Sequence, residues 1–225
     1  MLKRVPEPDL MEKKEQAYAY AYADFSDSNQ LFLGKLFEFY SITDQTEILD
    51  VGCGDGEIPI AIYKKTKSKI TALDGSSAML DEFSKKMSDN NIDDIKIIRK
   101  RYEDINLEEK NFDILISNSV LHHVKSPKQF WEKSLQLVRQ HGYIILMDLF
   151  RPSSENDLIT ILDRYGGNNP VLLKDFENSL RAAYTPEEVE AQISTFPDIS
   201  STVKVISDRH FFVTIEIKND SLFKT

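Results

Sequence analysis

The sequence predicts an α/β protein with a doubly wound, mostly parallel sheet. Strand-like apolar runs alternate with helix-like amphipathic segments through the middle of the chain, which is the order that such a sheet requires. Residues 143–149 form an unbroken apolar run, as expected for a strand buried on both faces of a parallel sheet. The run 48–51 leads into glycines at every second position and then into a helix-compatible segment, which indicates a tight strand-to-helix turn.

The composition is that of one globular domain. The chain has 225 residues, of which 41% are hydrophobic and 29% charged. The formal net charge of −9 disfavours broad contact with nucleic acid, because such binding depends mostly on Lys and Arg. No apolar run approaches the roughly 20 residues of a membrane helix, and no signal-peptide core follows the first residues. We therefore expect a cytoplasmic protein without membrane contact, whose oligomeric state, monomer or homodimer, the sequence leaves open.

The first 45 residues are expected to form a helical cap. Residues 1–9 are polar and contain two prolines, which favours a loose tail, whereas 10–23 are rich in helix-forming residues. A second helix is predicted over 27–40, where apolar residues recur every three or four positions. This cap either packs on the sheet or covers the ligand as a lid, in which case Tyr18 or Tyr22 would reach the substrate.

The central segment, residues 46–150, carries the alternating pattern. Its predicted strands cover 48–51, 69–73, 95–98, 112–118 and 143–149, and its predicted helices cover 58–63, 77–87 and 127–140. Gly142 is expected to end the last of these helices, because glycine is common just beyond a helix C-terminus.

The remaining residues are predicted to form a helical insertion and a hairpin. Residues 151–195 show no strand pattern, with helices expected around 159–162 and 171–180. Thr185-Pro186-Glu187-Glu188 is typical of a capping box, which begins a third helix that ends near residue 193. Residues 196–225 are expected to close the sheet as an antiparallel β-hairpin with strands at 203–206 and 211–217.

The turn after the first strand contains Gly52, Gly54 and Gly56. Glycine permits positive φ angles and lets a ligand approach the backbone, while the amides at the start of the following helix face that ligand. A dinucleotide-binding turn would have a third glycine at position 57, where this chain has Glu57. An acidic residue there repels a diphosphate, which argues against a nicotinamide-dependent oxidoreductase.

Two further acidic residues flank this turn. Asp50 ends the strand and Asp55 lies in the turn, so the site suits a ligand that carries positive charge. Cys53 is the single cysteine, which excludes an intramolecular disulfide and a thiolate metal cluster within the chain. Its place between two glycines favours a small packing residue over a nucleophile.

The stretch 48–57 resembles motif I of the class I S-adenosylmethionine-dependent methyltransferases, an apolar run followed by an acidic residue and G-x-G-x-G. The methyl donor of that family carries a sulfonium and an ammonium and no phosphate, which fits an acidic turn. Residues 74–80 match a second family motif, D-x-S-x-x-M-L, about twenty residues further on. The resemblance implies a Rossmann-like fold with seven strands, an antiparallel last strand, helices on both faces and S-adenosylmethionine as the cofactor.

The resemblance also implies a set of cofactor-binding residues. Asp74 would accept from the two ribose hydroxyls, since a carboxylate offers two acceptor oxygens. The adenine would contact Tyr102 or Glu103, although Arg101 stands where the family has an acidic residue. The full set is Asp50, Gly52, Cys53, Gly54, Gly56, Asp74, Gly75, Ser76, Met79, Tyr102, Glu103, Asn118 and Ser119.

Methyl transfer needs a base only when the acceptor must lose a proton. The family's Leu-His-His segment begins a short helix beside the cofactor, and here it supplies His122 and His123. Neighbouring helical residues point about 100° apart, so at most one ring faces the site easily, and no metal is expected at the pair. His210, at the mouth of the predicted hairpin, is a third candidate base. Each of the three histidines could instead be structural.

The insertion is assigned the acceptor side by analogy with class I enzymes. Arg151 and Arg181 could clamp a carboxylate or phosphate of the acceptor, or lie on the solvated surface. Asp148 could contact the acceptor or stabilise a turn. With Tyr18 and Tyr22, these residues complete the candidate substrate site.

The sequence therefore predicts a methyltransferase that transfers a methyl group from S-adenosylmethionine to a small-molecule acceptor. Two alternatives keep the cofactor: transfer of another group derived from it, or a non-catalytic role as a sensor or scaffold. A third alternative, an RNA-directed methyltransferase, requires a concentrated Lys/Arg face despite the acidic total. The lysines at 64–69 are the nearest run of that kind, and they suit a solvated helix end equally well.

Overall fold

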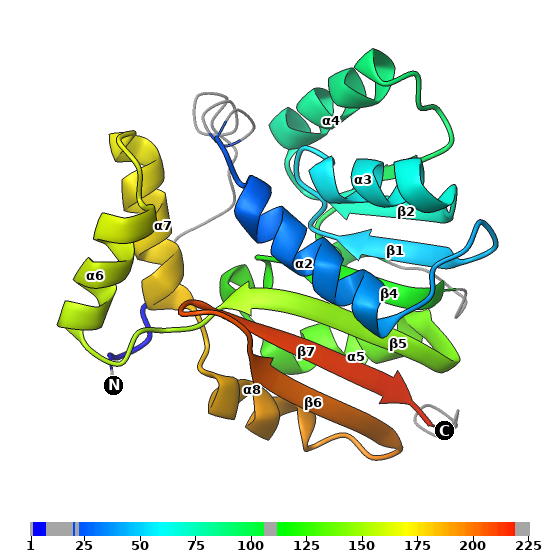
Figure 1. Ribbon diagram of the computed structural model, residues 1–225. Helices are drawn as coiled ribbons and strands as arrows, with labels where there is room; N and C mark the ends of the chain where they lie inside the picture. Colours follow the sequence, from blue (N-terminus) through cyan, green and yellow to red (C-terminus); the bar gives the residue numbers. More distant parts are fainter. Residues whose placement is uncertain (1, 8–19, 21–22, 106–111, 219–225) are drawn as a thin grey trace.

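Seven strands form one sheet in the order β3-β2-β1-β4-β5-β7-β6 (Figure 1). The computed structural model describes residues 2–7, 20, 23–105 and 112–218. The strands are β1 (Glu47–Val51), β2 (Lys69–Asp74), β3 (Lys96–Arg99), β4 (Phe112–Asn118), β5 (Val138–Leu149), β6 (Ile199–Val205) and β7 (His210–Ile217). The helices in the described part are α2 (Ser26–Phe39), α3 (Glu57–Thr66), α4 (Ser77–Asp89), α5 (Pro127–Leu137), α6 (Glu155–Tyr165), α7 (Pro170–Ala182) and α8 (Pro186–Ile193), with short 3-10 helices η1 (Tyr102–Asp104) and η2 (Leu121–His123).

The strand directions confirm the predicted fold class. Strands β1 to β5 are parallel to one another, and β7 runs antiparallel to both β5 and β6. The strand order reverses between β1 and β4, so the chain crosses from one half of the sheet to the other at that point. In open α/β sheets this switch point, at the carboxyl ends of the strands, is where ligands bind.

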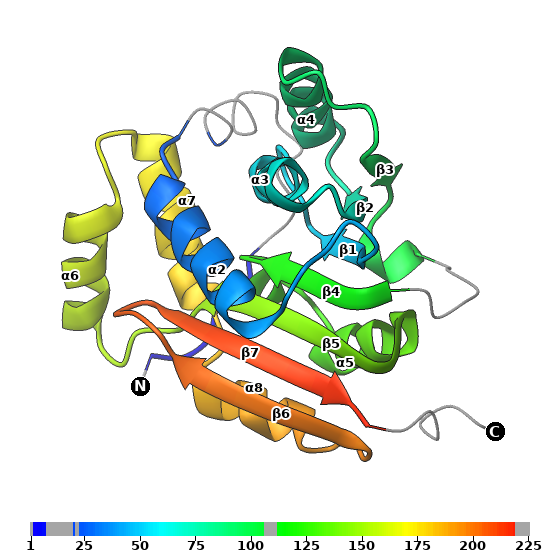
Figure 2. The same cartoon turned by 45° about the vertical axis from the view of Figure 1, so that its right-hand side comes forward.

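Helices cover both faces of the sheet because the central strands are apolar on both faces. Along β4, Ile114 and Ile116 pack toward α2, α3 and α4, where Phe83 is fully buried. Leu115 points to the opposite face and joins the cluster around Trp131 of α5, which also includes residues of α8. Figures 1 and 2 show α2 on one side of the sheet and α5 and α8 on the other.

The fifth strand begins earlier than predicted. Helix α5 ends at Leu137 and β5 starts at Val138, so the expected helix over 127–140 and its ending at Gly142 are wrong. Val138 pairs with Phe112, and the register shifts before Tyr143 pairs with Ile114. Gly142 lies at this irregularity, where a Cβ atom would stand 2.6 Å from the carbonyl oxygen of Asp113.

The two ends of the chain also differ from expectation. Strand β6 starts at Ile199, before the predicted residue 203, because the polar, exposed edge segment 200–202 pairs with β7. Residues 2–7 are not a loose tail: the amide of Val5 donates to the carbonyl of Arg181 at 3.0 Å. Most of the helix expected over 10–23 falls outside the described residues.

The segment after β5 is helical, as predicted. Helices α6 and α7 pack on each other through Leu158, Ile161 and Leu180, beside Leu149 at the end of β5. Figure 1 shows this pair beyond the edge of the sheet where β5 ends. Thr185 and Glu188 form the predicted capping box at the start of α8. In the described residues, no helix combines the length and apolar character needed to cross a membrane.

Candidate active site

The turn between β1 and α3 has the geometry that its glycines predict. Gly52, Gly54 and Gly56 have φ angles of 73°, 55° and 82°, in the left-handed region that favours glycine. A Cβ atom on Gly52 would lie 2.3 Å from Val120, and one on Gly56 would lie 2.0 Å from the ring of Phe83. Gly56 therefore serves the packing of α4 on the turn, whereas the space beside Gly54 stays open except for Met79 at 3.3 Å.

Asp74, at the end of β2, faces this turn. Its Oδ2 accepts from the amide of Gly54 at 2.9 Å, and its Oδ1 accepts from the amide of Ser76 at 2.8 Å. Burial raises the pKa of Asp74, although these backbone donors oppose the shift. The two hydrogen bonds fix the orientation of the carboxylate and leave lone pairs on both oxygens for a ligand.

Two buried acceptors lie beside Asp74 at the switch point. Oδ2 of Asp50 and Oδ1 of Asn118 have no hydrogen-bond partner among the described residues. Asp50 is 3% exposed, and burial together with the charge of Asp74 raises its pKa to about 8. Buried acceptors without donors are rare in folded proteins, so this pair indicates a ligand that brings a donor or a positive charge.

The other acidic residues of the turn are already paired. The ammonium of Lys86, on α4, lies 2.7 Å from Asp55 and 2.8 Å from Glu57. The repulsion of a diphosphate that the sequence suggested is therefore partly neutralised, and only Asp50 and Asp74 remain without a cationic partner among the described residues. The Cys53 thiol is buried, and burial raises its pKa, so it packs rather than acts as a nucleophile.

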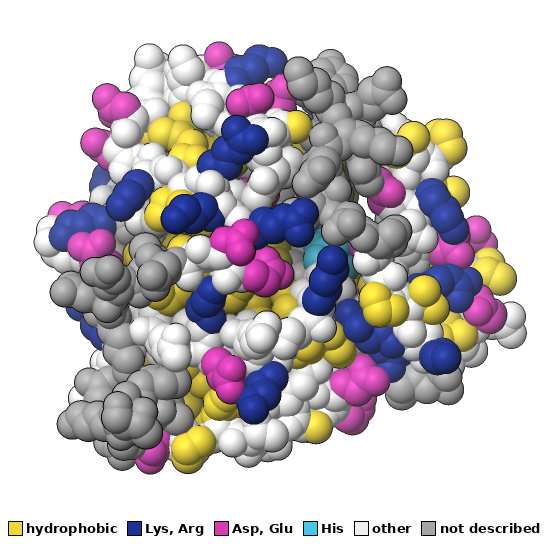
Figure 3. All heavy atoms as spheres, turned by 180° about the vertical axis from the view of Figure 1, so that it is seen from behind, with side chains coloured by type: hydrophobic (Ala, Val, Ile, Leu, Met, Phe, Trp, Pro, Cys, Tyr) yellow, Lys and Arg dark blue, Asp and Glu magenta, His cyan; other side chains and the backbone are white. Residues whose placement is uncertain are grey.

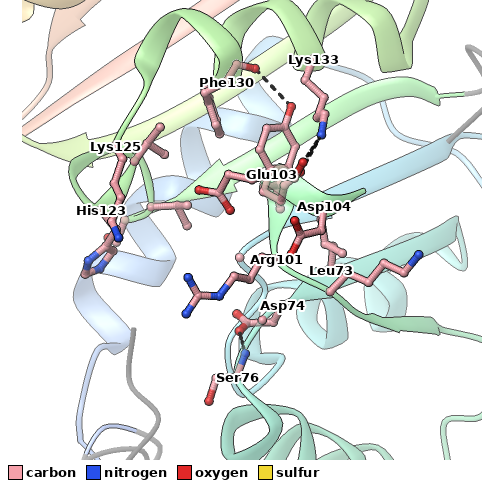
Figure 4. A pocket seen from close by; sticks show the side chains of 18 of the residues that line it. Leu73, Asp74, Ser76, Arg101, Glu103, Asp104, His123, Lys125, Phe130 and Lys133 are labelled. Atoms are coloured by element: carbon pink, nitrogen blue, oxygen red, sulfur yellow. Dashed lines mark hydrogen bonds between the residues drawn. The ribbon is translucent and has the colours of Figure 1, made fainter. Parts of the chain in front are cut away.

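A cavity of about 890 Å³ opens at the carboxyl ends of β1, β2 and β4. Figure 4 shows Asp74 and Ser76 on one side of it, His123 and Lys125 on another, and Arg101 extending between them. Of the predicted cofactor-binding residues, the cavity is lined by Gly52, Gly54, Asp74, Gly75, Ser76, Met79, Tyr102, Glu103, Asn118 and Ser119. Asp50 and Cys53 line a small adjoining pocket that shares Gly52, Gly54 and Asn118 with it, and Gly56 lies behind the turn.

The wall nearest η1 is fixed by hydrogen bonds. The hydroxyl of Tyr102 lies 2.7 Å from Ser134, and its ring packs against Phe130 at 4.9 Å between centroids. Lys133 donates to the carbonyl oxygen of Tyr102 at 3.3 Å and to that of Glu103 at 2.5 Å. Leu73 and Phe130 add apolar surface, so this end of the cavity suits a flat, partly apolar group.

The three candidate histidines lie in different surroundings. His122 is 3% exposed and does not line the cavity; its Nδ1 lies 2.5 Å from Oδ1 of Asp148. Burial lowers the pKa of His122, but the carboxylate of Asp148 outweighs it and the net shift is upward. His210 is also buried, with Nδ1 3.0 Å from the hydroxyl of Ser207, and burial lowers its pKa to about 4. Neither ring faces the cavity.

His123 does line the cavity, and its partner is a residue that sequence reasoning missed. Nδ1 of His123 lies 2.6 Å from Oε2 of Glu7, which also lines the cavity. Burial raises the pKa of Glu7, but the hydrogen bond from His123 and the nearby rings lower it overall. The ring centroids of His122 and His123 are 4.0 Å apart, and ligand atoms of Glu7 and both histidines lie within 4.8 Å of one another. No local signal links Glu7 to His123, since 116 residues separate them (123 − 7).

The three candidate substrate residues that the structure describes lie away from the cavity lining. Asp148 is 1% exposed and holds His122. Arg151 is buried and donates to the carbonyl of Ala183 at 2.8 Å and to Glu188 at 2.6 Å. Arg181 pairs with Glu155 and Glu177 on α6 and α7. Tyr18 and Tyr22 lie outside the described residues, whereas the neighbouring Tyr20 lines the cavity.

The comparisons with known proteins agree with this geometry. Residues 49–146 match a family model described as a methyltransferase domain. The chain is 32% identical over 119 residues to the tRNA U34 carboxymethyltransferase of Pseudoalteromonas atlantica, which covers 52% of this chain and 36% of that protein. It is 28% identical over 140 residues to the malonyl-acyl-carrier protein O-methyltransferase of Priestia megaterium. This match covers 60% of this chain and 50% of that protein. The chain thus spans half or less of the length of these curated relatives.

Among solved structures, the chain is similar to the plantazolicin methyltransferase BpumL in complex with a triazolic desmethylPZN analog and S-adenosylhomocysteine. The TM-score is 0.74 at 14% identity, over 93% of this chain and 92% of that chain. The family match over residues 49–146 and the similar fold support a class I S-adenosylmethionine-dependent methyltransferase domain, in agreement with the resemblance seen in the sequence.

Proposed function

We propose that the protein is a methyltransferase that transfers the methyl group of S-adenosylmethionine to a small-molecule acceptor. The observation that carries this proposal is the carboxylate of Asp74, held by the amide of Gly54 across the glycine turn. The two ribose hydroxyls of the cofactor are donors, and Asp74 has lone pairs left to accept from both.

The buried acceptors support the same ligand. The cofactor's ammonium and sulfonium would bring positive charge to Oδ2 of Asp50 and Oδ1 of Asn118, which have no partner among the described residues. The open space beside Gly54 lets the ligand approach the backbone. Tyr102, Phe130 and Leu73 would flank the adenine, and Glu103 would accept from its amino group.

When bound, S-adenosylmethionine supplies a methyl group on a positively charged sulfur, which an acceptor takes by in-line displacement. The residues of this chain hold the acceptor in line with that methyl group and keep water out. Such positioning is worth up to about 7 to 11 kcal/mol in well-oriented model reactions. No catalytic triad is required, so the positions of the turn, of Asp74 and of the apolar wall carry most of the effect.

A small-molecule acceptor fits the cavity volume and the acidic total charge, and one relative is named a malonyl-acyl-carrier protein O-methyltransferase. We also propose that the protein is cytoplasmic. Residues 151–195 supply none of the described lining of the cavity, so the acceptor contacts proposed here come from η2, the loop after it and the N-terminal segment.

The test is calorimetric titration with S-adenosylmethionine, S-adenosylhomocysteine and NAD. We expect micromolar binding of the first two, no binding of NAD, and loss of binding in an Asp74→Ala variant. Asp81→Ala is the matched control, because Asp81 is exposed on α4. The proposal would be wrong if the protein bound only NAD, or if wild type and Asp74→Ala bound S-adenosylmethionine equally well.

A second candidate is an RNA acceptor, which the tRNA-modifying relative and the basic side chains at the cavity suggest. Lys100, Arg101, Lys125 and Lys133 line the cavity, and Figure 3 shows Lys and Arg side chains near a histidine on the rear face. Acidic side chains lie among them, which argues against a continuous phosphate-binding surface. Salt-dependent binding of unmodified tRNA in the micromolar range would favour this candidate over the first.

A further inference from the structure

The N-terminal segment brings a carboxylate to the cavity wall. Glu7 accepts from the hydroxyl of Ser179 at 2.7 Å through Oε1, while its Oε2 lies 2.6 Å from Nδ1 of His123. Both carboxylate oxygens are therefore engaged, and the carboxylate has a fixed orientation toward the imidazole. Because a carboxylate only accepts hydrogen bonds, His123 carries its proton on Nδ1 in this contact.

The backbone around Glu7 is held as firmly as its side chain. The amide of Val5 donates to the carbonyl of Arg181 at 3.0 Å. Arg4 donates to the carbonyl of Ala182 at 2.6 Å and to the carbonyl of His122 at 3.0 Å. The segment 2–7 thus crosses the end of α7 and η2, and it joins Glu7 to the element that carries His123.

We propose that His123 is the general base of the reaction and that Glu7 is its positioning residue. With Nδ1–H donated to Glu7, the lone pair of the neutral imidazole lies on Nε2, which we assign to the acceptor because His123 lines the cavity. A base–carboxylate pair of this kind fixes both the tautomer and the ring orientation. This inference rests on the proposed methyl transfer and specifies the acceptor as a hydroxyl compound, such as a phenol or an enol.

The acceptor O–H proton moves to Nε2 of His123, the oxygen lone pair forms the new O–C bond, and the C–S bond breaks with its electron pair left on sulfur. The products are a methyl ether, a neutral thioether and an imidazolium whose charge is stabilised by Glu7. The imidazolium later releases its proton to water.

The other candidate bases lack one of these features. His122 donates to Asp148 and does not line the cavity, and His210 belongs to the hairpin. Glu7, His122 and His123 are close enough to hold a metal ion. Both Nδ1 atoms and both oxygens of Glu7 already have partners within the protein, so the contacts are explained without one.

The first test is the tautomer of His123, measured by long-range proton–nitrogen correlation on ¹⁵N-labelled protein with the cofactor bound. The chain has 4 histidines, which His→Gln variants assign. We expect the proton on Nδ1 in wild type, a shift toward Nε2 in Glu7→Ala, and an intermediate state in Glu7→Gln, which keeps an acceptor oxygen. Glu38→Gln is the control, because Glu38 pairs with Lys35 on the exposed face of α2. A proton on Nε2 in wild type, or no response to Glu7→Ala, overturns the proposal.

The second test measures S-adenosylhomocysteine release with phenol and 4-nitrophenol as probe acceptors. We expect His123→Ala to lower kcat for phenol by about 10²- to 10⁴-fold and Glu7→Ala by about 10- to 100-fold. Both losses should be much smaller for 4-nitrophenol, which is far more acidic than phenol and needs no base once it is ionised, and the Kd for the cofactor should not change.

The outcomes separate this inference from the proposed function. Cofactor binding with turnover of amine or thiol acceptors only would overturn the hydroxyl acceptor and leave the methyltransferase standing. If the wild-type protein does not bind the cofactor, both the inference and the proposed function are wrong. Added Zn²⁺ that binds stoichiometrically through Glu7, and chelation that abolishes turnover, would replace the base with a metal site.

Discussion

Nδ1 of His122 lies 2.5 Å from Oδ1 of Asp148, and the two side chains are 3% and 1% exposed. Asp148 also accepts from the backbone amides of His122 and Leu149, at 3.2 and 2.7 Å. The carboxylate therefore ties η2 to the end of β5. This buried pair shapes the wall next to His123 without facing the cavity.

Asp148→Asn should destabilise the fold by about 3 to 5 kcal/mol near pH 6, because it leaves a buried imidazolium without its partner. The pKa of His122 is raised in the folded protein, with Glu7 and Arg4 as the other charged groups that act on it. The stabilisation from the pair is thus complete below an unfolded pKa of about 6.5 and is lost as pH rises through the folded value. Urea unfolding across pH 5.5 to 9 should show this decline in wild type and a flatter profile in Asp148→Asn. An unchanged slope would contradict the assignment.

Asp50 should lower the stability of the ligand-free protein and strengthen cofactor binding. Its pKa is raised to about 8 from an ordinary value near 3.8, so the folded state holds a proton that the unfolded state has released. The contribution of Asp50 to the free energy of unfolding therefore falls as pH rises from about 4 to 8. Asp50→Asn should stabilise the ligand-free protein by about 1 to 3 kcal/mol at pH 9 and weaken S-adenosylmethionine binding at least tenfold.

The measurement is thermal unfolding with and without S-adenosylmethionine at pH 6 and pH 9. Asp81→Asn, on the exposed side of α4, should change neither quantity. If Asp50→Asn destabilises the ligand-free protein at pH 9, Asp50 has a partner that the structure does not reveal.

Local pattern predicted most of the fold, and the failures have physical causes. The period-3.6 and continuous apolar runs placed the central strands and helices, because these elements bury whole faces. The end of α5 was predicted too late, because Val138 is compatible both with the last turn of a helix and with the start of a strand. Its pairing with Phe112, from a distant segment, decides between them.

The residues of the candidate site also fall into two groups, those in local motifs and those that pair across the fold. The glycine turn and Asp74 belong to short local motifs, so the sequence and its resemblance to the family were enough to propose them. Lys86, which pairs with Asp55 and Glu57, and Glu7, which pairs with His123, act across the fold and leave no local pattern. The sequence therefore suggested three free carboxylates at the turn, whereas two are paired.

Gly56→Ala should be among the most damaging substitutions in the turn. Its φ of 82° strains any L-residue, and the new Cβ would stand 2.0 Å from the fully buried ring of Phe83. Together these effects should cost about 2 to 4 kcal/mol of unfolding free energy. Gly34→Ala is the matched control: Gly34 lies in α2, and a Cβ atom added there would have no neighbour within 4 Å, so the substitution should stabilise by up to about 1 kcal/mol. Equal midpoints in urea for the two variants would contradict the packing assigned to Gly56.

Arg4 should stabilise both the fold and the position of Glu7. Its guanidinium bridges the carbonyls of Ala182 and His122 and lies 3.9 Å from the ring centroid of Tyr184. Arg4→Ala removes two charge-assisted hydrogen bonds and the contact with the ring, which should cost about 1 to 3 kcal/mol. Arg4→Lys should recover little of this, because a single ammonium cannot span both carbonyls while stacking on the ring. Lys3→Ala, at the exposed neighbouring position, is the control. Thermal unfolding gives the stability, and the His123 tautomer gives the position of Glu7. A stability loss in Arg4→Ala with an unchanged tautomer would show that Ser179 alone holds the carboxylate.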